Sequence, residues 1–330
     1  MSVNSYIHLL ILAHVYSQLT YKKTPVWKHL AEGSPLPSPP FRYDWDWSQP
    51  KEQVKFREWH ELVAMETRFA TGYLPRGEAG GSALSTRTIA ESVYAHIQAC
   101  RGAGACYLLW GEKGYPEELL RLSVPPLGIA CLGNTELLFE PKVAVVGARK
   151  AGAGTLNLCW RLGKLLAEQG IVCVSGGAYG CDIAVHQGML YGRAKPVLAV
   201  VVFAQGLAQL YPRGNTGVFR QLLERGGLLL SERLWTQGAR PVDFPIRNRL
   251  ISGLSAVTVL MEAEERSGAM ITAQLALDQG REVLVLRFDP HALRGKGNQQ
   301  LIEDGALSFA SLEEFAALLA GKPLGSTWYE

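Results

Sequence analysis

The second half of the chain alternates short apolar runs with amphipathic segments, and this pattern restricts the possible folds. The runs are continuous and rich in Val, Ile and Leu, as in strands that are buried on both faces of a sheet. They cover residues 143–146, 171–174, 197–202, 228–230, 257–261 and 283–286. Helical patterns lie between them at about 155–169, 182–192, 216–225, 269–279 and 297–304. Repeated strand–helix–strand units predict an α/β fold with a doubly wound, mainly parallel sheet.

The first 105 residues have a different pattern and predict a small helical domain. Helical periodicity covers about residues 5–20, 52–72 and 85–101, separated by a proline-rich stretch and a glycine-rich stretch. Because five prolines fall within residues 33–50, that stretch cannot form a helix or a central strand, and we expect a connector there. We therefore divide the chain into a helical domain at 1–105 and a sheet domain at 106–330.

Charge and cysteine content indicate the compartment and the position of an anion site. The net charge is only +3, but from Lys142 onward 20 Lys and Arg face 16 Asp and Glu, so an anion site is expected in the second half. The six cysteines form no CxxC pair, and we expect them to be buried free thiols in a reducing compartment. No apolar run reaches the roughly 18 residues that span a bilayer. These features predict a cytoplasmic protein without a membrane segment.

The first predicted strand ends in a turn suited to an anion. Gly147 allows a close backbone approach, Arg149 and Lys150 add positive charge, and a helix begins shortly after Gly152. The spacing matches neither the GxGxxG fingerprint nor a Walker loop. The second strand ends at Ser175 without an acid to bind a ribose hydroxyl, which disfavours NAD. We therefore predict a phosphate site without a nucleotide cofactor.

Three further segments contribute to the predicted site. Ser175, Gly176 and Gly177 form a glycine-rich turn, which serves either tight strand–helix packing or a nest of N–H donors for a phosphate oxygen. Two arginines flank an asparagine at 247–249, a pair suited to bidentate phosphate binding, although one could instead hold a carboxylate such as Glu262. A Ser-Gly turn at 267–268 opens the next predicted helix.

No catalytic or metal-binding constellation accompanies these turns. The sequence lacks a GxSxG elbow and an HExxH motif, and Glu262 is the only acid at the end of a predicted strand. Asp182 and His186 are four residues apart on a predicted helix without a third ligand, which favours a helix cap and a hydrogen-bonded histidine. We therefore assign no catalytic residue, no metal and no cofactor.

Taken together, these motifs resemble the DNA-processing protein A family (DprA, also called Smf). The resemblance runs from about residue 115 to 320, and the segment around Arg247, Asn248 and Arg249 is its most specific part. Other matching motifs are Val146–Arg149, Ser175–Ala178 with Gly180, Asp182 and His186, Leu210–Asn215, Leu230–Glu232, Glu262–Ala263 with Ser267–Gly268, and Gly295–Ala306.

The resemblance implies an extended Rossmann-like fold that is often dimeric, binds single-stranded DNA and helps to load a RecA-type recombinase during natural transformation. The implied partners are single-stranded DNA, the recombinase and a second copy of the chain. The matching positions for phosphate contacts are Gly147, Arg149, Lys150, Ser175, Gly176, Gly177, Arg213, Arg247, Asn248, Arg249, Ser267 and Gly268. Tyr179 and Phe244 are candidates for base stacking, with a buried position favoured for Phe244.

The sequence departs from the family pattern at several positions, and no segment after the sheet domain predicts the winged helix that many members carry. The departures are Ala148, Tyr179, Ala204, Gln205, Ala208 and the stretch Arg287–Pro290. Two alternatives therefore stay open: a nucleotide N-glycosidase of the lysine-decarboxylase-like type, and a nucleotide sensor or protein-interaction module without DNA binding. The first is disfavoured because no acid follows the Ser267–Gly268 turn before Asp278.

Overall fold

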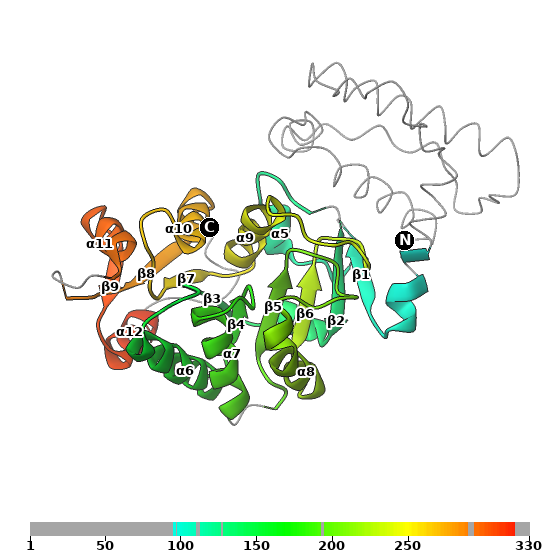
Figure 1. The fold of residues 1–330 in the computed structure, drawn as a ribbon, viewed down its shortest axis with the longest axis horizontal. Coiled ribbons are helices and arrows are strands. Elements are labelled where there is room, and N and C mark those ends of the chain that lie inside the picture. The colour runs from blue at the N-terminus through cyan, green and yellow to red at the C-terminus, as the bar shows by residue number, and fades with distance from the viewer. Residues whose placement is uncertain are drawn as a thin grey trace, which may run out of the picture.

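The computed structural model describes residues 95–320, with gaps at 97, 110–112, 127, 193–194 and 290–293. The predicted helical domain (except its last residues) and its proline-rich connector lie outside the described residues. Between residues 106 and 320 the chain forms one nine-stranded sheet, ordered β1-β2-β6-β5-β4-β3-β7-β8-β9, with helices on both faces (Figure 1).

The sheet confirms the predicted mainly parallel, doubly wound arrangement. Its parallel strands are β3 (Lys142–Val146), β4 (Val172–Ser175), β5 (Ala199–Phe203), β6 (Leu228–Ser231), β7 (Val257–Leu260), β8 (Glu282–Leu286) and β9 (Leu307–Phe309). Three strands were not predicted from the sequence. One is β9, which extends the β8 edge in parallel; the others, β1 (Cys106–Leu109) and β2 (Gly128–Gly133), extend the β6 edge in antiparallel fashion. The central strands are buried throughout, which explains their continuous apolar sequences.

The helices divide between the two faces of the sheet, each with its own apolar core. One face is covered by α6 (Ala153–Glu168), α7 (Cys181–Tyr191), α8 (Thr216–Glu224) and α12 (Leu312–Ala320). The other is covered by α5 (Glu117–Leu120), the 3₁₀ turn η1 (Thr135–Leu138), α9 (Asp243–Gly253), α10 (Gly268–Asp278) and α11 (Lys296–Glu303). A second 3₁₀ turn, η2 (Arg213–Asn215), precedes α8.

Two glycines bring α6 and α7 into direct backbone contact. A Cβ atom at Gly163 would lie 2.1 Å from the carbonyl oxygen of Val185, and one at Gly188 would lie 2.0 Å from that of Trp160. Larger residues would push the helices apart. This contact fixes the position of α7, whose first turn lies under the turn that follows β3.

The cysteine prediction is confirmed at five positions and wrong at one. All six cysteines are free thiols; five are buried, but Cys106 is exposed. Cys106 begins β1, the outermost strand of the sheet as described. Within the described residues, no helix is long and apolar enough to cross a membrane.

Candidate nucleic-acid interface

The direction of the chain reverses between β3 and β7. From β3 the chain proceeds to β4 on one side, and from β7 it proceeds to β8 on the other. In open α/β sheets, ligands bind beyond the carboxyl ends of the strands near such a point. The predicted phosphate-binding turns at 147–150, 175–177 and 267–268 lie at or beyond the carboxyl ends of β3, β4 and β7, so the fold brings them to one edge of the sheet.

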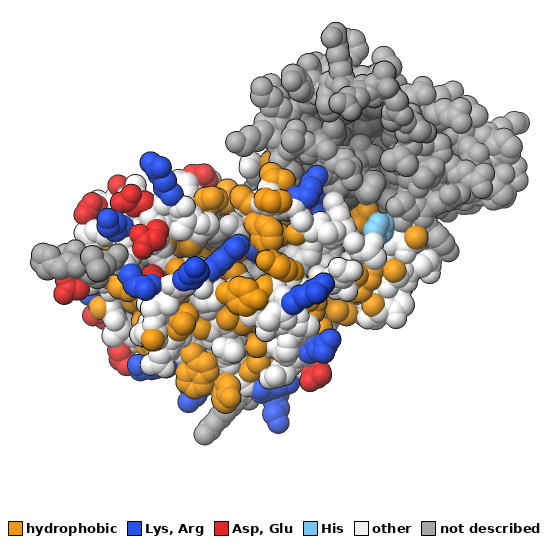
Figure 2. Space-filling view, viewed as in Figure 1, with side chains coloured by type: hydrophobic (Ala, Val, Ile, Leu, Met, Phe, Trp, Pro, Cys, Tyr) orange, Lys and Arg blue, Asp and Glu red, His pale blue; other side chains and the backbone are white. Residues whose placement is uncertain are grey.

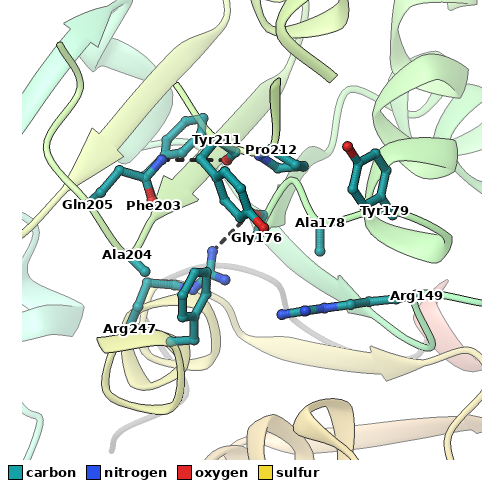
Figure 3. Close-up of a pocket in the computed structure, with 11 residues that line it drawn as sticks. Arg149, Gly176, Ala178, Tyr179, Phe203, Ala204, Gln205, Tyr211, Pro212 and Arg247 are labelled. Atoms are coloured by element: carbon teal, nitrogen blue, oxygen red, sulfur yellow. Dashed lines mark hydrogen bonds between the residues drawn. The ribbon is translucent and has the colours of Figure 1, made fainter. Parts of the chain in front are cut away.

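A small pocket, with a cavity volume of about 30 Å³, lies between the turns after β3, β4 and β5 and the first turns of α9 (Figure 3). Its lining residues are Arg149, Gly176, Ala178, Tyr179, Phe203, Ala204, Gln205, Tyr211, Pro212, Phe244 and Arg247. Five of them were predicted site residues: Arg149, Gly176, Tyr179, Phe244 and Arg247. The structure thus unites segments that are up to about 100 residues apart in the sequence.

Arg247 forms the base of this pocket. Its Nη1 donates to the carbonyl oxygens of Gly176, at 2.9 Å, and of Val202, while its buried Nε has no hydrogen-bond partner among the described residues. Burial lowers the pKa of Arg247 to about 10, and the nearby Asp182 opposes this effect. Arg247 therefore stays charged near neutral pH and ties the ends of β4 and β5 to α9.

The glycine-rich turn after β4 is held by an internal acid. The carboxylate of Asp182 accepts hydrogen bonds from the backbone N–H groups of Gly176, at 3.2 Å, and Ala178, at 3.3 Å. Ser175 is buried and donates from Oγ to the carbonyl oxygen of Val145, at 2.7 Å. Two donors of the predicted nest are thus already occupied, and the turn shapes the pocket wall.

The helix-cap interpretation of Asp182 and the hydrogen-bonded interpretation of His186 are both wrong. Asp182 bonds to the preceding turn, and burial raises its pKa, opposed by Arg247. His186 is fully buried, and neither ring nitrogen has a hydrogen-bond partner within the described residues. Because burial penalises the charged ring, the pKa of His186 falls to about 3.

Aromatic rings and an exposed cation form the open rim of the pocket. The guanidinium carbon of Arg149 lies 5.9 Å from the centre of the Phe244 ring, and Phe244 meets Tyr211 edge to face at 6.3 Å. Tyr179 is 48% exposed and Tyr211 is 52% exposed, so both present a ring surface to solvent, whereas Phe244 is half-buried. In Figure 3 the Arg149 side chain extends toward Arg247.

Arg213 lies beside this rim. It begins η2 and is exposed, and the Tyr179 ring packs against the neighbouring Gly214, where an added Cβ would lie 2.8 Å from the tyrosine oxygen. Lys150 is also exposed, one residue beyond Arg149. Neither Arg149 nor Arg213 forms an ion pair within the described residues. On the face in Figure 2, Lys and Arg side chains lie among hydrophobic side chains, whereas acidic ones gather near α11 and β9.

Nine of the predicted residues do not line the pocket, and among them the four on α9 and at the start of α10 make contacts of other kinds. The Arg249 Nη2 pairs with Glu232 at 2.6 Å, so the arginine that holds a carboxylate is Arg249, and its acid is Glu232 rather than Glu262. Asn248 donates from Nδ2 to the carbonyl oxygen of Gly268, at 3.2 Å. Ser267 caps α10 by accepting from the N–H of Met270, at 3.4 Å.

Gly147, a predicted phosphate contact, has a packing role in the structure. A Cβ there would lie 2.5 Å from the Sγ atom of Cys181 at the start of α7, so the turn lies directly against that helix. Sequence reasoning missed Gln205 and Tyr211 as lining residues. Tyr211 lies in the Leu210–Asn215 motif, two residues before Arg213. An aromatic residue close to a basic residue in a loop is the signal that could have identified it as a site residue.

A sequence profile described as "DNA recombination-mediator protein A" matches residues 106–320, which is the region from the start of β1 to the end of α12. The chain belongs to this family. DprA of Bacillus subtilis is 33% identical over 222 residues, which cover 66% of this chain and 72% of that protein. Smf of Borreliella burgdorferi and of Escherichia coli are each 34% identical, and the chain spans 65% and 56% of their respective lengths.

Solved DprA structures share the fold. The Streptococcus pneumoniae protein superposes with a TM-score of 0.61 and 25% identity, covering 80% of this chain and 90% of that one. DNA processing protein A from Helicobacter pylori, described for its single-stranded DNA binding mode, gives a TM-score of 0.59 and 29% identity, covering 65% and 96%. Among the departures from the family pattern, Tyr179, Ala204 and Gln205 line the pocket, and Arg287 pairs with Glu314 at 3.1 Å.

Proposed function

We propose that this chain binds single-stranded DNA in the pocket beyond β3, β4 and β5. The observation that carries the proposal is the rim itself, where the cation of Arg149 stands between exposed and half-exposed aromatic rings. Single-strand binding uses positive charge along the backbone together with aromatic surfaces on which bases stack. A paired and stacked duplex offers no free base for such a pocket, so the single strand is the favoured partner.

We assign the roles in this proposal by exposure. Arg149, Lys150 and Arg213 bind phosphates, because they are exposed and positively charged, whereas Tyr179 and Tyr211 stack with bases. Arg247 adds positive charge from below. The remaining predicted residues hold the turns in shape. The contacts described above do this for Gly147, Ser175, Gly176, Asn248, Arg249, Ser267 and Gly268, and the carbonyl oxygen of Gly177 accepts from Nδ2 of Asn215 at 3.0 Å.

The family description supports a wider role, namely recombination mediation. We propose that the bound strand is passed to a RecA-type recombinase in the cytoplasm during DNA uptake, and that the chain acts as a homodimer by binding and without catalysis. A strand-exchange assay with a RecA-type protein tests this step, since a mediator accelerates filament formation on the strand. Analytical ultracentrifugation tests the dimer.

The binding proposal is tested by fluorescence anisotropy of a labelled oligo-dT strand and of a duplex across a salt series. We expect preference for the single strand and an affinity that falls with salt. Each phosphate contact contributes a slope of about 0.7 in log affinity against log salt on single strands, so Arg149→Ala with Arg213→Ala lowers the slope by about 1.4. Arg161→Ala is the matched control, because Arg161 is exposed on α6 and lines a different hollow beside α12.

The proposal is wrong if the double variant keeps the wild-type slope, or if the Arg161 control loses as much affinity as the double variant does. Tight binding of a mononucleotide without strand binding would instead support a nucleotide sensor.

A further inference from the structure

Glu262 stands where a Rossmann-like fold commonly holds a phosphate. It lies two residues after the end of β7, at the point where the chain direction reverses, and it is only 3% exposed. Its Oε2 accepts hydrogen bonds from the N–H of Gly152, at 3.0 Å, and from Oγ1 of Thr155, at 2.7 Å. These donors belong to the N-terminus of α6, which is the usual partner of a phosphate group.

Glu262 also holds the turn after β3 at Ala148 and, through Arg294, at Lys150. The backbone oxygen of Glu262 accepts from the N–H of Ala148, at 2.7 Å, and Oε1 pairs with Nη1 of Arg294, at 3.0 Å. Arg294 also donates to the carbonyl oxygen of Lys150, at 2.9 Å. The turn from Ala148 to Gly152 is therefore fixed at its start, middle and end by contacts that converge on Glu262.

This clamp matters because the turn carries Arg149 and Lys150. Both side chains are exposed, and the backbone contacts determine where they emerge. A binding group that is held in position before the ligand arrives loses less conformational entropy on binding. The carboxylate also neutralises the positive end of α6, so the charge offered to the strand comes from the arginine and lysine side chains.

We propose that Glu262 is a positioning residue for DNA binding, acting as an internal anion that occupies the phosphate position of α6 and aims Arg149 into the neighbouring pocket. The inference rests on the proposed function. It also explains why a long strand rather than a free nucleotide suits this edge, because the site at the helix N-terminus is already filled by the chain itself.

A double-mutant cycle tests the proposal. Glu262→Gln preserves the shape of the side chain but removes its negative charge, so it weakens the hold on Arg294 and on the α6 donors. We expect oligo-dT affinity to fall about tenfold, equivalent to ~1.4 kcal/mol. In an Arg149→Ala background the same substitution should change affinity by less than about twofold, because the group that it positions is gone. An equal loss in both backgrounds would overturn the proposal.

Arg294→Ala provides a second, independent variant. Its side chain is 55% exposed, so its removal leaves folding less affected than a change at the buried acid, which thermal melting followed by circular dichroism verifies. The cycle with Arg149→Ala should again be strongly non-additive. If wild type itself fails to bind oligo-dT, the proposed function is wrong. If wild type binds and both cycles are additive, only the positioning role is wrong.

Discussion

Gly180→Ala should destabilise the protein strongly, because two separate features of this position exclude a side chain. Gly180 has φ of +80° and ψ of −127°, a conformation that is open to glycine and costs other residues about 1–3 kcal/mol. A Cβ would also lie 2.1 Å from the carbonyl oxygen of Ala148 and 2.6 Å from that of Arg149. The turn after β3 must then move away.

Moving that turn breaks two hydrogen bonds, from the N–H of Cys181 to Ala148 and from the N–H of Ala148 to Glu262. At about 1 kcal/mol each, added to the backbone strain, the free energy of unfolding should fall by about 3–5 kcal/mol. With an m-value of about 2–3 kcal/mol/M, the urea midpoint should drop by about 1.5 M at an unchanged slope. Affinity for oligo-dT should fall as well, since Arg149 moves with the turn.

Gly154→Ala is the control for this experiment. Gly154 lies in the first turn of α6, close in sequence to the same turn, but a Cβ there meets nothing within 4 Å. Removing a glycine from a helix should leave stability unchanged or raise it by up to about 1 kcal/mol. Equal urea midpoints for wild type and Gly180→Ala, within about 0.2 M, would refute the reasoning.

Three further outcomes follow from the contacts of individual residues. The pKa of His186 is about 3 in the folded protein against an ordinary value of 6.5, so the stability is full above pH 6.5 and falls at lower pH as the unfolded state takes up a proton. Between pH 7 and pH 5 the free energy of unfolding of wild type should fall by about 2 kcal/mol, a loss that His186→Leu should not show in urea titrations at the two pH values. Arg249→Ala leaves Glu232 without this buried partner and should cost about 3 kcal/mol of stability, while the salt slope of DNA binding stays that of wild type. Tyr211→Ala should weaken oligo-dT binding by about 1–3 kcal/mol in anisotropy titrations, whereas Tyr211→Phe, which keeps the ring, should bind as wild type does.

The parallel sheet could be predicted because its strands are buried on both faces. Continuous runs such as 143–146 and 257–261 carry that information locally, and the helices between them follow from their period. The strands β1, β2 and β9 escaped prediction. The antiparallel pairing of β2 with β6 joins residues about 100 positions apart, while β1 contains only four residues and β9 only three. Local patterns give no signal for a pairing of that kind.

At the candidate site, the sequence indicated which segments meet but not which side chains face the pocket. Arg247 and Arg249 looked equivalent, yet two residues along a helix point in different directions, so one lies beneath the pocket and the other pairs with Glu232. The roles of two buried acids were not predicted. The carboxylates of Asp182 and Glu262 accept hydrogen bonds from backbone N–H groups that were expected to bind phosphate, and only the folded arrangement brings these acids to the turns.

The central claim is that a single strand lies in the pocket rimmed by Tyr179 and Tyr211. It is tested most directly by ultraviolet crosslinking of a bromodeoxyuridine-substituted strand to the wild-type protein, with the adducts mapped by mass spectrometry. We expect adducts on peptides that contain Tyr179, Tyr211 or Phe244, and their loss when unlabelled oligo-dT competes. Adducts confined to other peptides, such as that of Trp160 on α6, with none at the pocket, would contradict the account.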